Sequence, residues 1–164
     1  KHEEELGGQG VQREPGAILW AKWEADPEPY GGLKTLREIK RAKKAKASVL
    51  HLADRKIRDL SPLASLTDLE ALYLGLNEIR DLSPLAGLSN LTYLNLYANR
   101  VSDVTPLSGL TRLDTLFLDR NKITKITPLA KLSKLEWLAV RENPLAKGEA
   151  DAIRKALPDC ELKD

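Results

Sequence analysis

Between residues 69 and 134, the apolar residues of this chain recur in a pattern that is written three times with a period of 22 residues. The copies cover residues 69–90, 91–112 and 113–134, and each reads L-x-x-L-x-L-x-x-N-x-[IV]-x-x-[LVI]-[ST]-P-L-x-x-L. A fixed period of this kind indicates a solenoid in which each copy forms one coil. Because one copy cannot bury its own leucines, the coils must stack to form a continuous core.

Each copy predicts a strand followed by a short helical turn. The L-x-L segment alternates at period two, so its leucines face inward, and stacked coils form a parallel sheet. A hydroxyl residue followed by proline predicts an N-cap and the first position of a helix. Only four or five residues remain before the next strand, so this turn should be of the 3₁₀ type. The pairs are Ser61-Pro62, Ser83-Pro84, Thr105-Pro106 and Thr127-Pro128.

The asparagine at the ninth position of each copy follows the strand, where the chain must bend. Its amide group both donates and accepts hydrogen bonds, so stacked asparagines can satisfy backbone groups that the turn would otherwise leave buried and unpaired. The first coil, residues 47–68, is a degenerate copy with Arg55 at this position, so its turn is expected to differ. Residues 135–143 begin a fifth copy, which places five repeats in residues 47–143.

The segments outside the repeats are predicted to be a tail and two caps. Residues 1–17 are polar and are expected to form a flexible tail. Residues 18–46 form an N-terminal cap, in which Trp20 and Trp23 either seal the open end of the core or provide a docking site. Residues 144–164 form a C-terminal cap, with a helix over residues 149–157 and a last short strand near Leu162.

The N-terminal cap includes a basic helix over residues 33–46. Leu33, Leu36, Ile39 and Ala42 form one apolar stripe, which is expected to lie on the first strand. Residues 32–46 carry seven basic groups and one acidic group, whereas the whole chain has a net charge of only +2. This basic face is either solvated or contacts an acidic partner, and nucleic acid or lipid is less favoured. No aromatic residue interleaves with the lysines, which argues against nucleic acid. The patch comprises Arg37, Lys40, Arg41, Lys43 and Lys44.

Composition describes a globular chain with 42% hydrophobic and 30% charged residues. No apolar run approaches the roughly 20 residues of a transmembrane helix. The chain has no methionine and begins at Lys1, so we expect a fragment or a processed product. The sequence therefore does not determine the cellular compartment, and a cell-envelope or secreted location would follow if a signal peptide preceded Lys1. The single cysteine, Cys160, is expected to be a small buried residue rather than a reactive thiol.

The repeats resemble the 22-residue, internalin-like subclass of bacterial leucine-rich repeats, which reads N-x-I-x-D-[IL]-x-P-L-x-x-L. Residues 77–85 match this pattern almost completely, residues 99–107 match with valine for isoleucine, and residues 121–129 depart from it at Lys125. The resemblance covers residues 47–143. It implies a right-handed α/β solenoid with its parallel sheet on the concave face, 3₁₀ turns on the convex face and helical caps, and it implies protein recognition.

In such a coil, the positions that flank the leucines of the strand point outward from the concave face. Every aromatic residue of the repeats falls at one of these positions, and none occupies a core position. Exposed aromatic residues are costly in solution and are enriched in binding hot spots. Stacking along the sheet is the alternative explanation for them. The predicted binding residues are Tyr73, Tyr93, Asn95, Tyr97, Phe117, Asp119, Arg120, Trp137 and Arg141.

The sequence therefore predicts a non-catalytic, monomeric module that binds a protein or peptide through this aromatic face. The alternative is a structural or regulatory segment of a larger protein, for example a signalling protein, that contacts its partners through the basic helix and Trp20 and Trp23. No enzymatic activity is expected, because no phosphate-binding loop, metal-ligand spacing or nucleophile motif is present. No cofactor or metal is expected either.

Overall fold

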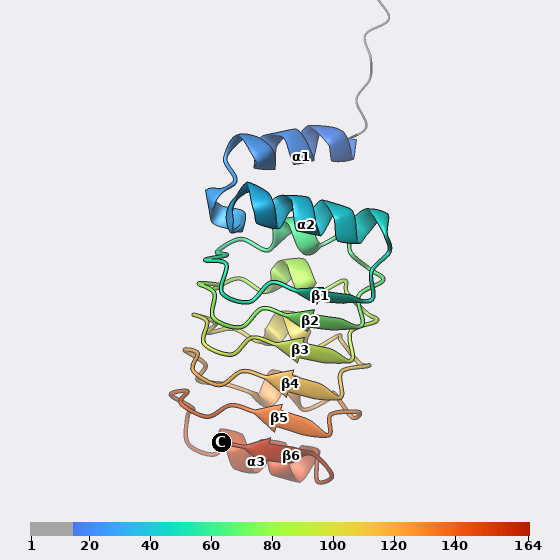
Figure 1. Ribbon diagram of the computed structural model, residues 1–164. Coiled ribbons are helices and arrows are strands. Elements are labelled where there is room, and N and C mark those ends of the chain that lie inside the picture. The colour runs from blue at the N-terminus through green and yellow to red at the C-terminus, as the bar shows by residue number, and fades with distance from the viewer. Residues whose placement is uncertain (1–14) are drawn as a thin grey trace, which may run out of the picture.

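The computed structural model describes residues 15–164, which form one stack of coils (Figure 1). A single parallel sheet of six short strands runs through the stack in sequence order. Adjacent strands pair in register, so that Leu50, Leu72 and Leu94 are neighbours across the sheet. The predicted leucine-rich α/β solenoid is thus confirmed. The strands are β1 (Val49–His51), β2 (Ala71–Tyr73), β3 (Tyr93–Asn95), β4 (Thr115–Phe117), β5 (Trp137–Ala139) and β6 (Glu161–Lys163).

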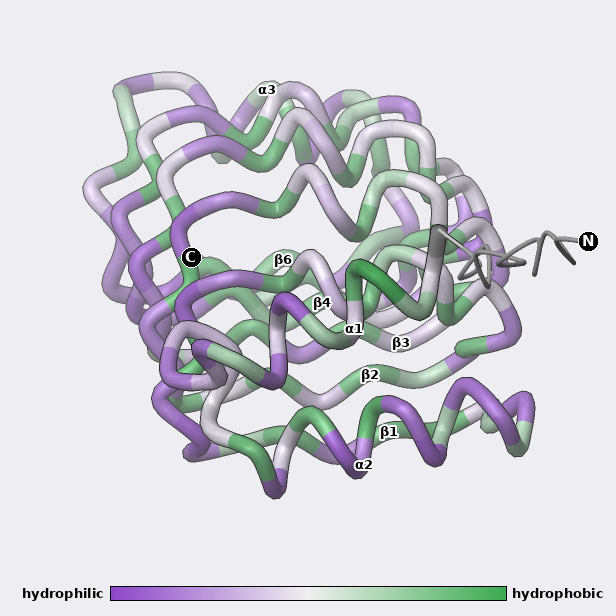
Figure 2. The backbone as a smooth tube through the Cα atoms, turned by 90° about the horizontal axis from the view of Figure 1, so that it is seen from above, coloured by the Kyte–Doolittle hydropathy of each residue, from purple (hydrophilic) through white to green (hydrophobic). Residues whose placement is uncertain are grey.

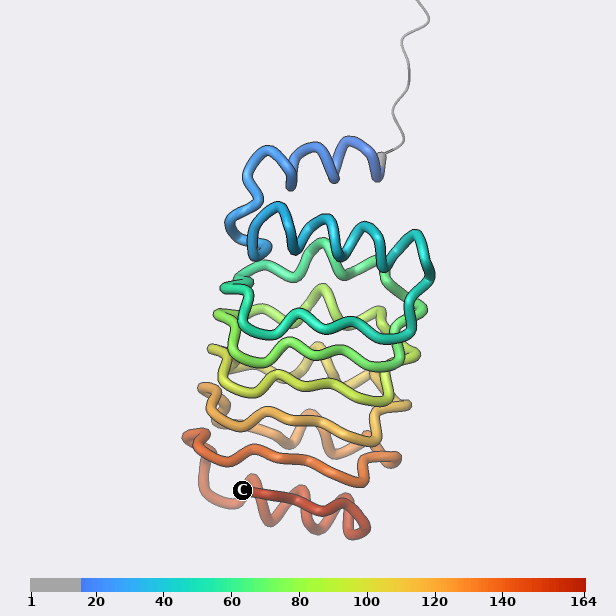
Figure 3. The backbone as a smooth tube through the Cα atoms, viewed as in Figure 1, coloured from blue at the N-terminus to red at the C-terminus, as the bar shows by residue number. Residues whose placement is uncertain are grey.

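Short 3₁₀ helices form the side of each coil opposite the sheet (Figure 3), as the Ser-Pro and Thr-Pro pairs predicted. The predicted hydroxyl N-cap is wrong, however. Each 3₁₀ helix starts at the serine or threonine itself, and the apolar residue before it takes the N-cap position without a side-chain hydrogen bond. Instead, the Asp81 carboxylate accepts a hydrogen bond from the Ser83 backbone. The turns are Ser61–Leu63, Ser83–Leu85, Thr105–Leu107 and Thr127–Leu129.

The core runs through the middle of the stack and consists almost entirely of the leucine, isoleucine and valine positions of the repeat. Leu72, Leu94 and Leu116, one from each of three successive strands, are completely buried. Figure 2 looks down the stack from the α1 end, with the coils one behind another. Burying a side chain of this size stabilises the fold by about 1.5–3 kcal/mol.

The ninth-position asparagines link each coil to the preceding one, as predicted. The amide nitrogen of Asn99 donates to the carbonyls of Leu74 and Leu96, and its oxygen accepts from the N–H of Ile79. Asn77, Asn121 and Asn143 make the same set of bonds in their own coils. These buried backbone groups would otherwise lack partners, which makes the asparagine ladder part of the core.

The first coil departs from this pattern at Arg55. Every coil has a non-glycine residue of positive φ at the eighth position, which is Asp54 in the first coil. The first coil has a second such residue, Lys56, two positions later. The Arg55 side chain leaves the ladder and pairs with Glu38 at 3.1 Å. The altered turn that the sequence predicted is therefore present, and it ties the first coil to the N-terminal cap.

Two helices, α1 (Pro15–Ala25) and α2 (Gly32–Lys44), form the N-terminal cap, with a 3₁₀ turn at Glu28–Tyr30 between them. Helix α2 lies next to β1, and α1 lies beyond it at the end of the stack (Figure 1). Of the predicted apolar stripe of α2, Leu36 and Ile39 are buried, whereas Leu33 is exposed. Thr35, which was not part of the predicted stripe, is also buried. The Thr35 hydroxyl is satisfied because it donates to the carbonyl of Gly31 at 2.8 Å.

The tryptophans of α1 are buried against the end of the core. Trp20 and Trp23 are each only 8% exposed and pack edge to face at 4.9 Å. This arrangement favours the sealing role, and the alternative of a docking site built on these two rings is contradicted by their burial. Of the predicted tail, residues 1–14 lie outside the described residues, whereas residues 15–17 belong to the first turn of α1.

The C-terminal cap consists of α3 (Glu149–Ala156) and β6. Ile153 and Leu157 are buried against the last coil, which closes the core at this end. The predicted last strand is present, and it pairs with β5 so that Leu138 and Leu162 are neighbours. Cys160 is partly buried against the core, and burial raises the pKa of its thiol, which agrees with the predicted structural role.

Candidate functional site

The outward side of the sheet carries the residues that flank the buried leucines, and we call it the sheet face. Strand pairing places them in two columns, the third and fifth positions of each repeat. The third-position column is Val49, Ala71, Tyr93, Thr115 and Trp137, and the fifth-position column is His51, Tyr73, Asn95, Phe117 and Ala139. These are the columns that the sequence predicted.

Five rings form a continuous aromatic stripe across the sheet face. The stripe consists of His51, Tyr73, Tyr93, Phe117 and Trp137. The distances between successive ring centroids are 4.2, 4.7, 5.9 and 6.4 Å. The first pair is stacked with an interplanar angle of 19°, whereas the later pairs are tilted by 34–52°. Rings in adjacent strands therefore contact one another, and the stripe opens progressively towards β5.

The rings of the stripe are neither sealed in the core nor fully exposed. Tyr73, Tyr93, Phe117 and Trp137 are half-buried, and His51 is exposed at one end. Partial burial raises the pKa of the Tyr93 hydroxyl. At the other end, the ammonium group of Lys163 lies 5.2 Å from the centre of the Trp137 ring. The stripe thus presents apolar ring surface with a cation at the β6 end.

Beside the open end of the stripe is a depression of about 350 Å³, which we call the sheet-face hollow. Its lining comes from three successive coils, and Phe117 belongs to both the stripe and the hollow. The lining residues are Asn95, Tyr97, Phe117, Asp119, Arg141 and Glu142. Five of these six were predicted as binding residues, so the structure brings most of the predicted site together.

Two ion pairs border the hollow. Arg141 bonds to Asp119 through its side-chain Nε at 2.8 Å and through its backbone N–H at 3.1 Å. Arg120 bonds to Glu142 through Nε at 2.9 Å and to the Tyr97 hydroxyl through Nη1 at 3.0 Å. These bonds, first to Tyr97 and then to Glu142, raise the pKa of Arg120.

Asp119 does not lie where the sequence placed it. It was predicted as a binding residue at an outward position, but only 5% of it is exposed. Its carboxylate is held in the floor of the hollow by Arg141, which lies 22 residues later in the next coil. A buried carboxylate needs a charged partner of this kind, whereas a carboxylate exposed to water does not.

Sequence reasoning left three residues of this region out of the predicted site. His51 starts the aromatic stripe, Glu142 orients Arg120, and Lys163 covers Trp137. His51 and Glu142 stand at outward positions of the repeat, so their columns were a usable signal. The position of Lys163 follows from the pairing of β6 with β5, and β6 lies outside the repeats, so the repeat pattern gave no signal for it.

The basic patch of α2 is separate from the sheet face. Arg37, Lys40, Arg41, Lys43 and Lys44 are all exposed, as predicted. Lys40 pairs with Glu24 of α1 at 3.3 Å and lies 5.7 Å from the centre of the Trp20 ring. One lysine of the patch therefore helps to hold α1 on α2.

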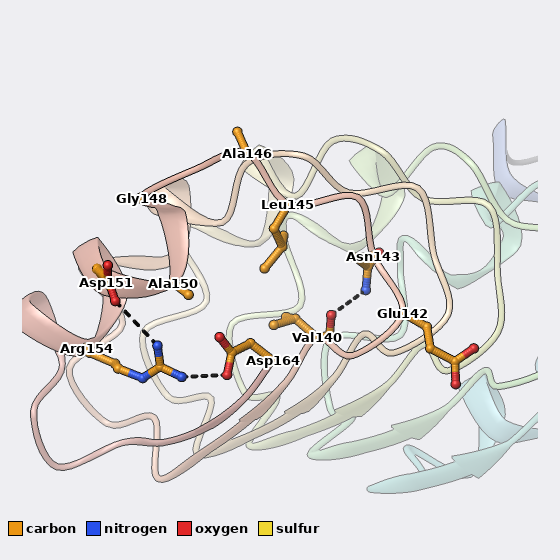
Figure 4. Close-up of a pocket in the computed structure, with 10 residues that line it drawn as sticks. All are labelled: Val140, Glu142, Asn143, Leu145, Ala146, Gly148, Ala150, Asp151, Arg154 and Asp164. Carbon is orange, nitrogen blue, oxygen red and sulfur yellow. Dashed lines mark hydrogen bonds and ion pairs between the residues drawn. The ribbon is translucent and has the colours of Figure 1, made fainter.

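A second depression, of about 400 Å³, lies between the last coil and α3 (Figure 4). There Arg154 pairs with both Asp151 and Asp164, so its charge is compensated within the cap. Among residues 15–164, no three histidine, cysteine or acidic side chains come together as metal ligands. Within the same residues, no helix is both long and apolar enough to cross a membrane.

A family model described as "Leucine Rich repeats (2 copies)" matches residues 48–87 and 89–131. The chain is similar to the structure of an internalin C2 from Listeria monocytogenes, with 40% identity and a TM-score of 0.66 over 74% of this chain and 54% of that chain. It is also similar to the structure of an internalin (inlF) from the same organism, with 37% identity and a TM-score of 0.68 over 75% of this chain and 36% of that chain.

For a leucine-rich repeat protein of Leptospira interrogans, the identity is 30% and the TM-score 0.69, over 76% of this chain and 33% of that one. The chain therefore spans about half of the first structure and about a third of the other two. Comparison with curated proteins gives no match.

Proposed function

The chain belongs to the leucine-rich repeat family, with internalin-like bacterial repeats, and we propose that it is a non-catalytic module that binds a protein or peptide through its sheet face. Members of this family generally act as protein-interaction modules, and the similar structures are two internalins and a leucine-rich repeat protein. The partner and the mode of binding are the parts that this proposal adds.

The aromatic stripe is the observation that carries the proposal. Four tyrosine, phenylalanine and tryptophan rings lie side by side on the sheet face, where they are half-buried rather than sealed in the core. Aromatic side chains supply much of the energy at the centre of protein interfaces because they bury a large apolar area with few rotatable bonds. The five strands of the stripe span roughly 20 Å at the usual strand spacing. This length suits an extended peptide or one face of a small domain.

Ring-to-ring stacking alone accounts less well for the stripe. Contacts between cross-strand neighbours stabilise a sheet by roughly 0.2–1 kcal/mol per pair, and β-branched residues would supply them without exposing aromatic surface. The stripe also loosens towards β5, where the ring spacing reaches 6.4 Å beside the hollow. Optimised stacking would favour a uniform, close spacing, whereas an open end beside a depression suits a ligand.

The test is the double variant Tyr93→Ala/Phe117→Ala, assayed by affinity capture with mass spectrometry. Partners retained by the wild-type chain should be lost. Both rings are half-buried, so the variant will also lose roughly 1–3 kcal/mol of stability. Val101→Ala is the matched control, because it removes buried volume from the core and leaves the sheet face intact. Equal capture by the double variant and the wild type would refute the proposal.

The basic patch on α2 supports a second candidate, contact with an acidic partner. All five of its side chains are exposed, although Trp20 and Trp23 no longer contribute to this alternative. Reversing the charge of Lys43 and Lys44, with and without Lys40, separates the two candidates. Capture that survives the Tyr93/Phe117 variant but fails after charge reversal would favour α2. Nucleic-acid binding would instead show retention on DNA that falls steeply with salt.

A further inference from the structure

Arg141 is held in one orientation by a buried acid. Its Nε and its backbone N–H both donate to the same carboxylate oxygen of Asp119, which is almost completely buried. The two Nη groups make no hydrogen bond within residues 15–164, and the side chain is 55% exposed. A guanidinium that is fixed through Nε presents its Nη fork outward and loses little freedom when it binds.

Arg120 is fixed in the same way in the preceding coil. Its Nε donates to Glu142 and its Nη1 donates to the Tyr97 hydroxyl, which leaves Nη2 uncommitted. The two arginines are neighbours, because the backbone N–H of Arg120 donates to the carbonyl of Arg141 at 2.9 Å. Both guanidinium groups are bonded to residues that line the sheet-face hollow, Arg120 to Tyr97 and Glu142 and Arg141 to Asp119.

The side-chain amide of Asn95, which also lines the hollow, can donate a hydrogen bond to a ligand. The side-chain oxygen of Asn95 accepts the backbone N–H of Tyr97 at 3.0 Å. Its amide NH₂ neighbours the Tyr93 hydroxyl and has a second hydrogen left for a ligand. By contrast, both carboxylates are engaged by arginines. A basic ligand would have to share Asp119 or Glu142 with an arginine that already neutralises its charge, because each arginine engages one oxygen of its carboxylate. An acidic ligand would use the free donors and break neither pair.

From this arrangement, we propose that the sheet-face hollow receives an aspartate or glutamate side chain of the partner protein. Arg141 and Arg120 bind the carboxylate, which guanidinium groups recognise with paired, charge-assisted hydrogen bonds. Asn95 donates a further bond, and the ring of Phe117 packs against the methylene groups. Asp119 and Glu142 act as positioning residues for the two arginines. This inference rests on the proposed function, because it assigns the partner chemistry of the same face.

A random 12-residue peptide library displayed on phage and panned on the immobilised chain provides the probe. Enriched peptides should share an acidic residue next to an apolar one. In each synthesised peptide, Glu→Gln or Asp→Asn should weaken binding by tenfold or more, as measured by fluorescence polarisation. Arg141→Gln and, separately, Arg120→Gln should remove most of the difference between the acidic peptide and its amide counterpart.

Arg112→Gln is the control, because this arginine bonds to Asn90 away from the sheet face and should leave the acid preference unchanged. Arg141→Lys keeps the positive charge but removes the paired Nη donors, so it should also lose most of the preference for the acidic peptide over its amide counterpart. Peptides that need Tyr93 and Phe117 but show no acid preference would overturn this inference and leave the proposed function standing. If no enriched peptide depends on the sheet face, both fail.

Discussion

The carboxylate of Glu149, in α3, accepts a hydrogen bond from the backbone N–H of Thr127 at 3.0 Å, across 22 residues of sequence. It also accepts one from the neighbouring Ile126 at 2.8 Å. In the three earlier coils, an aspartate of the same coil accepts the hydrogen bond from the corresponding N–H, as Asp103 does from Thr105. The third full copy of the repeat has Lys125 at that position, so the C-terminal cap supplies the missing acid.

Glu149→Gln should therefore destabilise the chain by about 1 kcal/mol, because it weakens two charge-assisted hydrogen bonds at the last turn. Adding Lys125→Asp to this variant restores an acid within the coil and should recover much of the loss. Urea unfolding followed by circular dichroism measures both. If Lys125→Asp gives no recovery, Glu149 is not a replacement for the aspartate of the repeat.

The asparagine ladder predicts a difference between an interior and a terminal rung. Asn99→Ala leaves the buried N–H of Ile79 without a partner and removes one of the two donors from the carbonyls of Leu74 and Leu96, so it should cost roughly 3 kcal/mol. Asn143 makes equivalent bonds but is only half-buried at the last coil, so water can replace some of them. Asn143→Ala should cost roughly half as much. Equal losses of unfolding free energy in urea would contradict this reasoning.

The turn carboxylates predict loss of stability in acid. Hydrogen bonds from Ser83 and Thr105 hold the pKa of Asp81 and of Asp103 below the ordinary value of 3.8. Partial burial raises the pKa of Glu149, but the backbone hydrogen bonds of Thr127 and Ile126 outweigh it and place the pKa below 4.5. A lowered folded pKa stabilises the fold above the unfolded value, and this contribution disappears as the pH falls through the folded value.

The urea midpoint should therefore fall as the pH drops below 4.5, towards and past 3.8. The variant Asp81→Asn/Asp103→Asn should start from a lower midpoint at pH 7 and decline less steeply in acid. Parallel curves for the variant and the wild type would show that these two aspartates do not contribute to the acid sensitivity.

Two adjacent glycines at the start of α2 predict unequal effects of one substitution. Both have positive φ, 83° at Gly31 and 87° at Gly32. A methyl group on Gly31 would lie 2.8 Å from the carbonyl oxygen of Arg55, whereas Gly32 has open space around it. Gly32→Ala should cost about 1 kcal/mol for the backbone conformation alone. Gly31→Ala should cost at least twice that, and thermal unfolding of the two variants measures the difference.

The repeat pattern predicts most of the fold because each position fixes its own environment. A leucine at the fourth position, such as Leu94, faces the core in every coil, and the residues beside it face outward. The period of 22 residues then brings equivalent positions together in adjacent strands. The aromatic stripe was predictable for this reason, because Tyr93 and Phe117 stand at outward positions of adjacent coils.

The features that the sequence analysis missed depend on contacts between particular side chains, which the repeat period does not specify. Asp119 is buried because Arg141 happens to follow it in the next coil, and the repeat allows any residue at that position. Glu149 serves the third full copy from a helix that lies outside the repeats. The hydroxyl N-cap was misplaced by one residue because an acid two residues earlier, such as Asp81, satisfies the turn instead. The contacts of Asp119 and Glu149 join different coils or a cap to a coil, so the period of the repeat does not specify them.

The left-handed residue at the eighth position of each coil has a consequence for how this chain can change. These residues are Asp54, Leu76, Ala98, Arg120 and Glu142, with φ between 52° and 57°. An acid, an aliphatic chain, a methyl group and a base all adopt the same backbone there, so the bend is imposed by the coil rather than by the side chain. Each coil thus offers a site at which mutation can alter surface chemistry while the scaffold stays the same, and new binding specificities can arise there without a new fold.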